Sequence, residues 1–294
     1  MNFSPEQLIK LSWLIYYMRP EYITESSSLG DIINKLINGL NSGDNYKELL
    51  VSRKNSKKFL LSIVNDSAIS SLILDKYKED ITGQRIAVCS YNNDAIIIFR
   101  GTSSKREWID NVDSVIMKDT PLQKSCKEFV DEIINTNNYN NIITLGHSKG
   151  GNLAQYVAIK CDKINKAISI NGTGFSNKFC TEYAKLICKN KNKIYEINSK
   201  KDIVSQILNH FSDNIKVIDT NVSYFKAHLP MTLLKNGKLN SKAVVSKALK
   251  NWNKFTINIS KKTPKIAFIL ANSLTALIII LQNIIINMYD MFNK

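Results

Sequence analysis

One serine of this chain stands in a five-residue pattern that is typical of an activated nucleophile. The pattern is GHSKG at residues 146–150, with Ser148 at its centre. An apolar run at 142–145 precedes it, and apolar residues recur at helical spacing from 152 to 160. A strand, a sharp turn and a helix in this order predict a nucleophile elbow, which presents the serine hydroxyl for attack on a carbonyl carbon.

The two glycines of the pattern are required by the sharpness of the predicted turn. A side chain at Gly146 or Gly150 would collide with neighbouring backbone. The same turn holds Ser148 in a strained conformation and aims the first amide of the helix, that of Lys149, at the place where an oxyanion forms. Because short patterns also arise by chance, a catalytic function requires an acid, a base and a second oxyanion donor elsewhere in the chain.

The chain has three histidines from which the base can come. His147 adjoins Ser148, where neighbouring side chains point apart, so we expect it to brace the turn. His210 follows a short apolar segment and is expected to be an ordinary half-buried or surface histidine. His228 lies after the last predicted strand, at the carboxyl edge of the sheet, where a base can reach the serine. His228 is therefore the predicted base.

The acid that orients the base is predicted to be Asp202, in the loop after an earlier strand. With this choice the order along the chain is Ser148, Asp202, His228, which is the order found in α/β-hydrolases. Asp219 is closer to His228 in sequence and is the second choice, and Asp213 is the third.

Thr102 is the predicted second donor to the oxyanion. The apolar strand at 95–100 ends at Gly101 and Thr102, which places an amide and a short hydroxyl at the edge of the sheet where ligands bind. Its neighbour Ser103 is a candidate to share this role. A different interpretation is that the Thr102 hydroxyl caps a helix near Glu107.

The elements that must position these residues alternate between strands and helices. This alternation predicts an α/β fold, a mostly parallel, doubly wound sheet with helices on both faces. Helices are expected at 4–18, 29–40, 67–77, 121–135 and 177–189. Strands are expected at 85–90 and 95–100, which form a hairpin, and at 142–145, 166–170, 193–197 and 215–218.

Composition and charge narrow the class of protein. The chain has 294 residues, of which 44% are hydrophobic, and a net charge of +15. From Lys235 onward there are ten lysines and one acid, so most of the positive charge belongs to the tail. No zinc-ligand spacing or RNA-binding motif accompanies it, so nucleic acid is not an expected partner. The five cysteines lack metal-ligand spacing, so we expect reduced, buried thiols and neither a metal nor another cofactor.

The tail joins a basic segment to an apolar one. Residues 240–265 are predicted to be a basic amphipathic helix and linker, with the helix at 241–255 packed on the sheet. Residues 266–288 carry no charge, and their length is sufficient for a membrane span of about 20 residues. Polar residues also form one stripe of this segment, which is typical of a helix that lies in an interface, docks on its own domain or self-associates.

The start of the chain lacks the basic segment and cleavage site of a secretory signal. We therefore expect a cytoplasmic protein. The order of the tail, basic and then apolar, indicates attachment to the inner face of the cell membrane.

Taken together, the motifs resemble the class 3, or fungal-type, lipase family of α/β-hydrolases. The segments that carry the likeness are FRGT at 99–102, REWIDN at 106–111, GHSKGGNLA at 146–154 and DIVSQIL at 202–208, followed by a late histidine. The chain is most similar to a bacterial branch of that family with this elbow, over residues 3–239. By that resemblance Ser148 is the nucleophile, Asp202 the orienting acid and His228 the base, while Thr102 and the Lys149 amide form the oxyanion hole.

Two positions depart from the family pattern. Asn111 stands where the family tends to place an acid, three residues after the tryptophan, and NGTGF at 171–175 stands where the branch has DGPGF. The resemblance implies a lipase-like hydrolase domain at 1–239, followed by the basic segment at 240–265 and the apolar helix at 266–294. We expect a serine hydrolase that cleaves an acyl-lipid ester through an acyl-enzyme. The alternative is a hydrolase-fold scaffold or binding protein at a membrane, without turnover.

Overall fold

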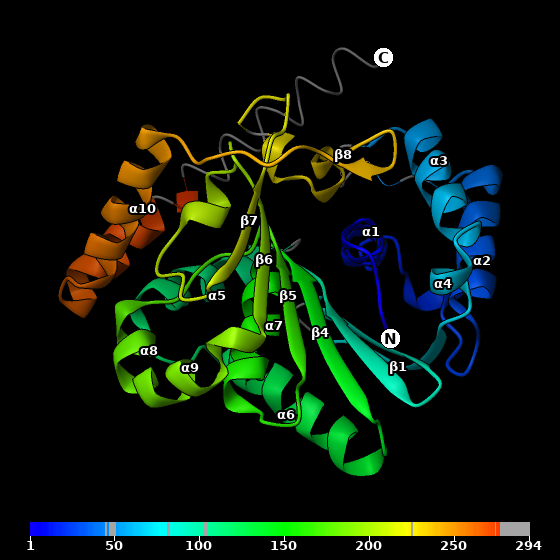
Figure 1. Ribbon diagram of the computed structural model, residues 1–294, viewed down its shortest axis with the longest axis horizontal. Helices are drawn as coiled ribbons and strands as arrows, with labels where there is room; N and C mark the ends of the chain where they lie inside the picture. Colours follow the sequence, from blue (N-terminus) through cyan, green and yellow to red (C-terminus); the bar gives the residue numbers. More distant parts are fainter. Residues whose placement is uncertain are drawn as a thin grey trace.

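The computed structural model describes residues 1–44, 46, 51–80, 83–102, 105–224, 226–273 and 275–276 (Figure 1). Its principal sheet has seven strands that follow one another in sequence order. They are β1 (Ile73–Glu79), β2 (Arg85–Tyr91), β3 (Asp94–Phe99), β4 (Asn141–His147), β5 (Lys166–Ile170), β6 (Ile194–Ser199) and β7 (Asn214–Ile218). The first three strands pair antiparallel, and β3 to β7 are parallel. The predicted, mostly parallel sheet is confirmed.

The central strands are apolar because both faces of the sheet are covered. In β3 the side chains alternate, so that Ile96 and Ile98 pack in one core while Ile97 and Phe99 pack in the other. A strand buried on both faces reads as a continuous apolar run, and β3 has the sequence DAIIIF.

Helices cover the two faces, and they come from different parts of the chain (Figure 1). One face packs against helices that precede the sheet: α1 (Pro5–Leu14), α2 (Leu29–Ser42), α3 (Arg53–Val64) and α4 (Ser67–Ser70). The other face packs against helices that connect the parallel strands: α6 (Pro121–Thr136), α7 (Lys149–Lys160), α8 (Asn177–Glu182) and α9 (Ala184–Asn190). The expected α/β-hydrolase architecture, with helices on both faces, is therefore present.

Two expectations about single elements were wrong, and one helix was missed. The helix expected at 67–77 is only the short α4, and the chain continues as β1, whose partner β2 lies further along the sequence. A short segment can match both the helical and the strand periodicity of apolar residues. Pairing with a strand elsewhere in the sequence then decides which structure forms. The helix α3 was not expected, and the helix expected at 177–189 is divided into α8 and α9 at Tyr183.

Short elements complete the fold. Helix α5 (Lys105–Ile116) follows β3, and β8 (Leu234–Lys235) pairs with β9 (Lys238–Leu239). The 3₁₀ helices are η1 (Pro20–Tyr22), η3 (Lys191–Lys193), η4 (Val204–Gln206), η5 (Lys226–His228) and η6 (Pro230–Leu233).

Helix α10 (Lys247–Ser260) was expected to pack on the sheet, but it packs against the loop after β6 and against α5 and α8. Its Trp252 Nε1 donates to the carbonyl oxygen of Ile203 at 2.9 Å. Its Asn253 Nδ2 donates to the carbonyl oxygens of Gln206 at 2.9 Å and Leu208 at 2.7 Å. The helix thereby holds the loop that follows β6.

The apolar tail is described only in part. Residues 264–273 are helical, whereas residues 277–294 of the expected helix at 266–294 lie outside the described residues. Within the described part of the chain, no helix is long and apolar enough to cross a membrane.

Candidate active site

The turn between β4 and α7 holds Ser148 in a conformation that side-chain-bearing residues rarely adopt, with φ at +57° and ψ at −126°. A Cβ at Gly146 would lie 2.1 Å from the carbonyl oxygen of Gly150, and one at Gly150 would lie 2.2 Å from that of Phe99. Neither glycine can therefore be replaced without a backbone shift. The Ser148 amide donates to the carbonyl oxygen of Ile170 at 3.0 Å, which ties the turn to the neighbouring strand.

Three predicted residues, from three different segments, meet at the carboxyl edge of the sheet. His228 Nε2 lies 2.9 Å from Ser148 Oγ, and His228 Nδ1 lies 3.1 Å from Asp202 Oδ2. The Asp202 side chain is fully buried and accepts from the amides of Val204 at 2.9 Å and Ser205 at 3.1 Å. These two hydrogen bonds fix the orientation of the carboxylate, so that its Oδ2 also faces the imidazole of His228.

The hydrogen bonds of His228 determine which of its nitrogens carries the proton. A carboxylate only accepts, so Nδ1, which faces Asp202, is the N–H donor. In the neutral ring Nε2 then presents its lone pair to the Ser148 hydroxyl. This is the arrangement that general-base catalysis requires.

The other two acids that the sequence offered lie elsewhere. Asp219 pairs with Lys200 Nζ at 2.7 Å, and Asp213 pairs with Lys191 Nζ at 2.6 Å. Of the three acids considered, Asp202 is the one that His228 contacts.

The loop after β3 lies directly against the nucleophile elbow. A Cβ at Gly101 would lie 2.9 Å from Ser148 Cβ, so the absence of a side chain allows this approach. The next residue, Thr102, accepts a hydrogen bond at its Oγ1 from Asn111 Nδ2 at 3.0 Å. Since the amide supplies the proton of that bond, the Thr102 hydroxyl proton stays free to donate. Ser103, the candidate to share this role, lies outside the described residues.

Lys149 contributes more than the amide that the sequence indicated. That amide is at the first position of α7, where it has no partner within the helix. Its side chain is only 1% exposed, and Nζ forms an ion pair with Asp110 Oδ2 at 2.6 Å and also contacts Ser114 Oγ. The second oxygen of Asp110 accepts from the Leu122 amide at 3.2 Å. A buried ion pair thus joins α5 and α6 to the elbow.

Sequence reasoning missed Tyr16, which is central to the site. Burial lowers the pKa of His147 well below its usual value, and nearby His228 acts in the same direction, so the ring of His147 is neutral. Its Nε2 lies 2.8 Å from the carbonyl oxygen of His228 and must carry the proton, since a carbonyl only accepts. Nδ1 therefore accepts from the Tyr16 hydroxyl at 2.8 Å, and the Tyr16 oxygen accepts from the Gly101 amide at 3.0 Å.

This relay connects the backbone of the candidate base to the loop that carries Thr102. The rings of Tyr16 and His147 are also in aromatic contact, with their centroids 5.7 Å apart. No local motif indicates Tyr16, which is 131 residues from His147.

The third histidine and the cysteines lie apart from these contacts. His210 pairs with Glu196, with Nδ1 2.7 Å from Oε2. All five cysteines are unpaired, and of these Cys89 and Cys126 are buried as expected, whereas Cys188 is exposed. In the described part of the chain, no group of three or more His, Cys, Asp or Glu side chains could hold a metal ion.

Comparison with known proteins places the chain in a family. A sequence model of the Mbeg1-like family matches residues 68–266, which is more than half of the chain. A search of curated proteins finds no match.

Three solved structures of lipases are similar to the chain. The chain is similar to Lip2 lipase from Yarrowia lipolytica, with 14% identity and a TM-score of 0.45 over 83% of this chain and 88% of that one. A triacylglycerol lipase from Penicillium expansum has 13% identity and a TM-score of 0.38 over 52% and 71% of the two chains. A fungal lipase in complex with an inhibitor has 17% identity and a TM-score of 0.34 over 56% and 71%. The bacterial branch stays a prediction.

Proposed function

This chain belongs to the Mbeg1-like family, and on that premise we propose that it is a serine hydrolase that cleaves a carboxylic ester. The observation that carries the proposal is the hydrogen-bonded series from Asp202 through His228 to Ser148, with contacts of 3.1 and 2.9 Å. The series begins at a fully buried carboxylate and ends at a hydroxyl in a strained turn. Each group is thus held in the role that acyl transfer needs.

The reaction proceeds through an acyl-enzyme. Ser148 Oγ attacks the ester carbonyl while His228 Nε2 takes its proton, and Asp202 stabilises the imidazolium that forms. The oxyanion of the tetrahedral intermediate accepts hydrogen bonds from the Lys149 amide and from Thr102. When the carbon–oxygen bond breaks, His228 gives its proton to the leaving alcohol. Water, deprotonated by the same nitrogen, then attacks the acyl-enzyme. When the bond from the acyl carbon to Ser148 Oγ breaks, His228 returns the proton to Oγ and the acid is released.

An acyl lipid is the substrate class that we propose. Supporting it are apolar side chains on the surface of elements close to the elbow. Ile109 of α5 is 65% exposed, one residue before the Asp110 that pairs with Lys149. Phe255 of α10, which contacts α5, is also exposed.

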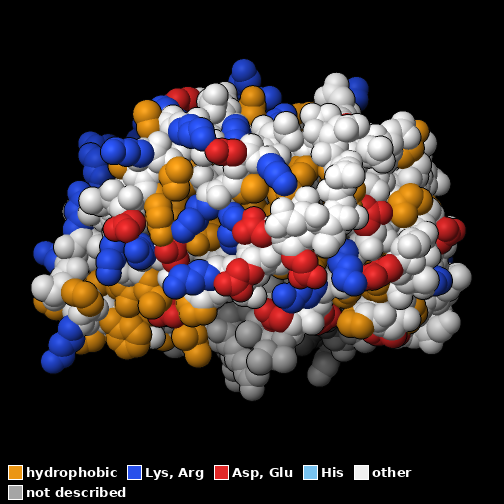
Figure 2. Space-filling model, turned by 90° about the horizontal axis from the view of Figure 1, so that it is seen from below, with side chains coloured by type: hydrophobic (Ala, Val, Ile, Leu, Met, Phe, Trp, Pro, Cys, Tyr) orange, Lys and Arg blue, Asp and Glu red, His pale blue; other side chains and the backbone are white. Residues whose placement is uncertain are grey.

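We also propose that the tail attaches the protein to an anionic membrane surface on the cytoplasmic side. The helix at 264–273 exposes Ile266, Phe268, Ile269 and Leu270, and three lysines stand at 261, 262 and 265. Figure 2 shows hydrophobic side chains gathered beside Lys and Arg at the end of the molecule that carries α8 and α10. Apolar side chains next to cations are the combination that binds an anionic lipid interface.

Labelling with a fluorophosphonate probe tests the enzyme proposal. We expect the wild-type protein to be labelled and Ser148→Ala, His228→Ala and Asp202→Asn to lose labelling. His210→Ala and Asp219→Asn are the matched controls and should keep it. A wild-type protein without labelling would favour the alternative of a silent scaffold. Loss of labelling in His210→Ala, with labelling kept in His228→Ala, would show that His210 is the base.

Flotation with lipid vesicles tests the membrane proposal. The full chain should float with phosphatidylcholine vesicles that contain phosphatidylglycerol, and salt should weaken the binding. The double variant Phe268→Asp and Ile269→Asp should stay in the soluble fraction, whereas Tyr91→Asp, at an exposed site in β2, should float. Equal flotation of both variants, or none for the wild type, would contradict the proposal.

A further inference from the structure

A second cluster of polar side chains lies in the fold and takes no part in the hydrogen bonds of the candidate active site. Glu196 of β6 is fully buried, and its Oε2 lies 2.7 Å from Nδ1 of His210, whose ring is 13% exposed. Asn198 Nδ2 donates to the same oxygen at 3.2 Å. Both nitrogens therefore meet at one oxygen, which places the side chains of Asn198 and His210 next to each other.

The cluster leaves hydrogen-bonding capacity unused. In the part of the chain that the structure describes, Asn198 Oδ1, His210 Nε2 and Glu196 Oε1 are buried and have no hydrogen-bond partner. Asn198 is only 2% exposed. A buried polar atom without a partner is unfavourable, so three of them in one cluster indicate a site that a ligand completes.

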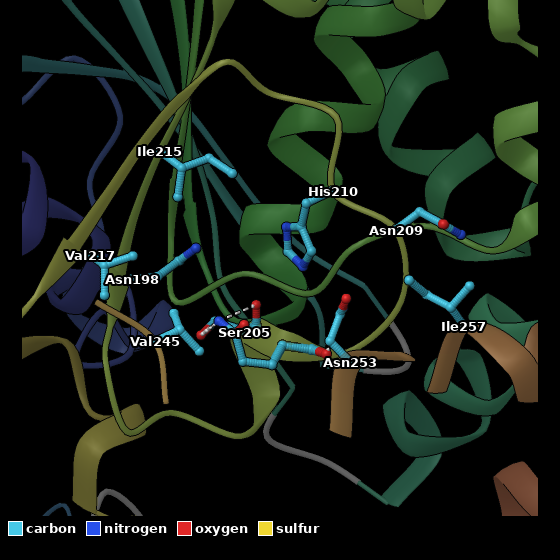
Figure 3. A pocket seen from close by; sticks show the side chains of 10 residues that line it. Asn198, Ser205, Asn209, His210, Ile215, Val217, Val245, Asn253 and Ile257 are labelled. Carbon is cyan, nitrogen blue, oxygen red and sulfur yellow. Dashed lines mark hydrogen bonds between the residues drawn. The ribbon is translucent and has the colours of Figure 1, made fainter. Parts of the chain in front are cut away.

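Two of these side chains line a cavity of about 260 Å³ between β7 and α10 (Figure 3). Its polar wall is formed by Asn198 and His210, and its apolar wall by Ile215, Val217, Val245 and Ile257. Its other lining residues are Ser205, Gln206, Asn209 and Asn253. Ile215 is 42% exposed, which places one side of the cavity at the protein surface.

The existing contacts decide what the polar wall can donate and accept. The amide nitrogen of Asn198 is committed to Glu196, so Oδ1 is left as an acceptor. Burial lowers the pKa of His210, but the Glu196 carboxylate and, to a smaller extent, the backbone of Ile207 outweigh this effect and raise that pKa above its usual value. When the ring holds two protons, Nδ1 donates to Glu196 and Nε2 carries the second proton, so that the wall offers one donor beside one acceptor.

We propose that this cavity binds a small uncharged alcohol. Its hydroxyl oxygen accepts from His210 Nε2–H, its hydroxyl proton is donated to Asn198 Oδ1, and its apolar body contacts Val217 and Val245. The imidazolium and the Glu196 carboxylate together carry no net charge. A cationic ligand would be repelled by the imidazolium, and an anionic ligand by the carboxylate. A hydroxyl is the smallest group that both donates and accepts.

The cavity adjoins the loop of the candidate catalytic acid. Ser205 lines it, and the Ser205 amide donates to Asp202 Oδ2 at 3.1 Å. Asn253 lines it from α10 and holds the carbonyl oxygen of Gln206. An alcohol is also a product of ester cleavage, so a ligand in this cavity is positioned to change the rate of that reaction. This effect on the rate rests on the proposed function, whereas binding of the alcohol does not.

Titration of the full chain with cyclohexanol, followed by NMR of histidine labelled with ¹³C, tests the binding. The chain has three histidines, and His210→Gln identifies the His210 signal. We expect a saturable shift of that signal in the wild type and, equally, in Ser148→Ala. Cyclohexyl methyl ether, which accepts but cannot donate, should bind at least tenfold more weakly.

Two variants, one on each wall of the cavity, ensure that misfolding of a single variant does not decide the result. Asn198→Leu removes the acceptor and should weaken cyclohexanol binding at least tenfold. Val217→Phe fills the apolar side, leaves the polar cluster intact, and should do the same. Asn138→Leu, at an exposed position after α6, is the matched control and should bind as the wild type does. Absence of a saturable shift, equal binding of the ether, or unchanged affinity in both wall variants would overturn the proposal, whatever the fluorophosphonate result.

Discussion

The hydroxyl of Tyr16 donates to Nδ1 of His147 across 2.8 Å, although the two residues are 131 positions apart in the chain. Through this bond the first helical segment reaches the nucleophile elbow. On one side the relay continues to the Gly101 amide, and on the other to the carbonyl oxygen of His228. Tyr16 therefore links the backbone of His228, the candidate base, to the backbone of the loop that carries Thr102.

Removing the Tyr16 hydroxyl should lower the rate without a comparable effect on substrate binding. Tyr16→Phe loses the bonds to His147 and Gly101, each worth about 0.5–1.5 kcal/mol. We expect kcat to fall about tenfold with KM nearly unchanged, because the base and the oxyanion loop are less well held. Steady-state kinetics with a chromogenic ester measure this. Tyr17→Phe, in the next position and directed at Ser56, is the control and should keep the wild-type kcat.

The hydroxyl of Thr102 should contribute directly to oxyanion stabilisation. Thr102→Val keeps the shape and removes the donor, so kcat should fall about 10²–10³-fold. Thr102→Ser keeps the hydroxyl and should retain most of the activity. If valine and serine reduce kcat equally, the hydroxyl is not the donor.

The buried ion pair beside the elbow should be a stability determinant. Lys149→Met leaves the Asp110 carboxylate buried and unpaired, and we expect the free energy of unfolding to fall by about 3–5 kcal/mol. Adding Asp110→Asn should recover part of that loss, because no uncompensated charge then remains. Urea denaturation of the single and double variants measures the difference.

An exposed pair gives the matched control for this prediction. Lys189 Nζ and Asp162 Oδ2 are also 2.6 Å apart, but both side chains are largely exposed. Lys189→Ala should therefore change the free energy of unfolding little. A loss as large as that of Lys149→Met would mean that burial is not the cause.

Acid should destabilise the fold through His147. Burial, the largest effect, and the neighbouring His228 lower the pKa of His147 in the folded state, so the folded chain keeps this ring neutral. The unfolded chain takes up a proton at this residue below about pH 6.5. Stability from this group is therefore complete above that pH and falls as the pH drops, by up to about 1.4 kcal/mol per pH unit.

Urea denaturation between about pH 7 and pH 5.5 measures this effect as the difference between two proteins. The wild type should lose more stability on acidification than His147→Gln, whose side chain does not titrate. Slopes that coincide would show that His147 does not stay neutral in the folded state.

Local chemistry was readable from the sequence because it depends on fixed spacing along the backbone. The glycines on either side of Ser148 and the periodicity of the helices both involve neighbours within a few residues. The fold class followed from the alternation of such elements. The order Ser148, Asp202, His228 could be proposed because each residue follows a predicted strand.

What required the tertiary structure is the pairing of polar groups that are far apart in the chain. The contact of His228 with Asp202, the ion pair of Lys149 with Asp110, and the link of Tyr16 to His147 depend on packing across the sheet. The same holds for β1, whose register comes from β2. Burial makes each of these polar pairings strong and costly to leave incomplete, and burial is a property of the assembled fold. The sequence by itself therefore determined which residue could be the nucleophile, and only the tertiary structure decided which residues hold it in place.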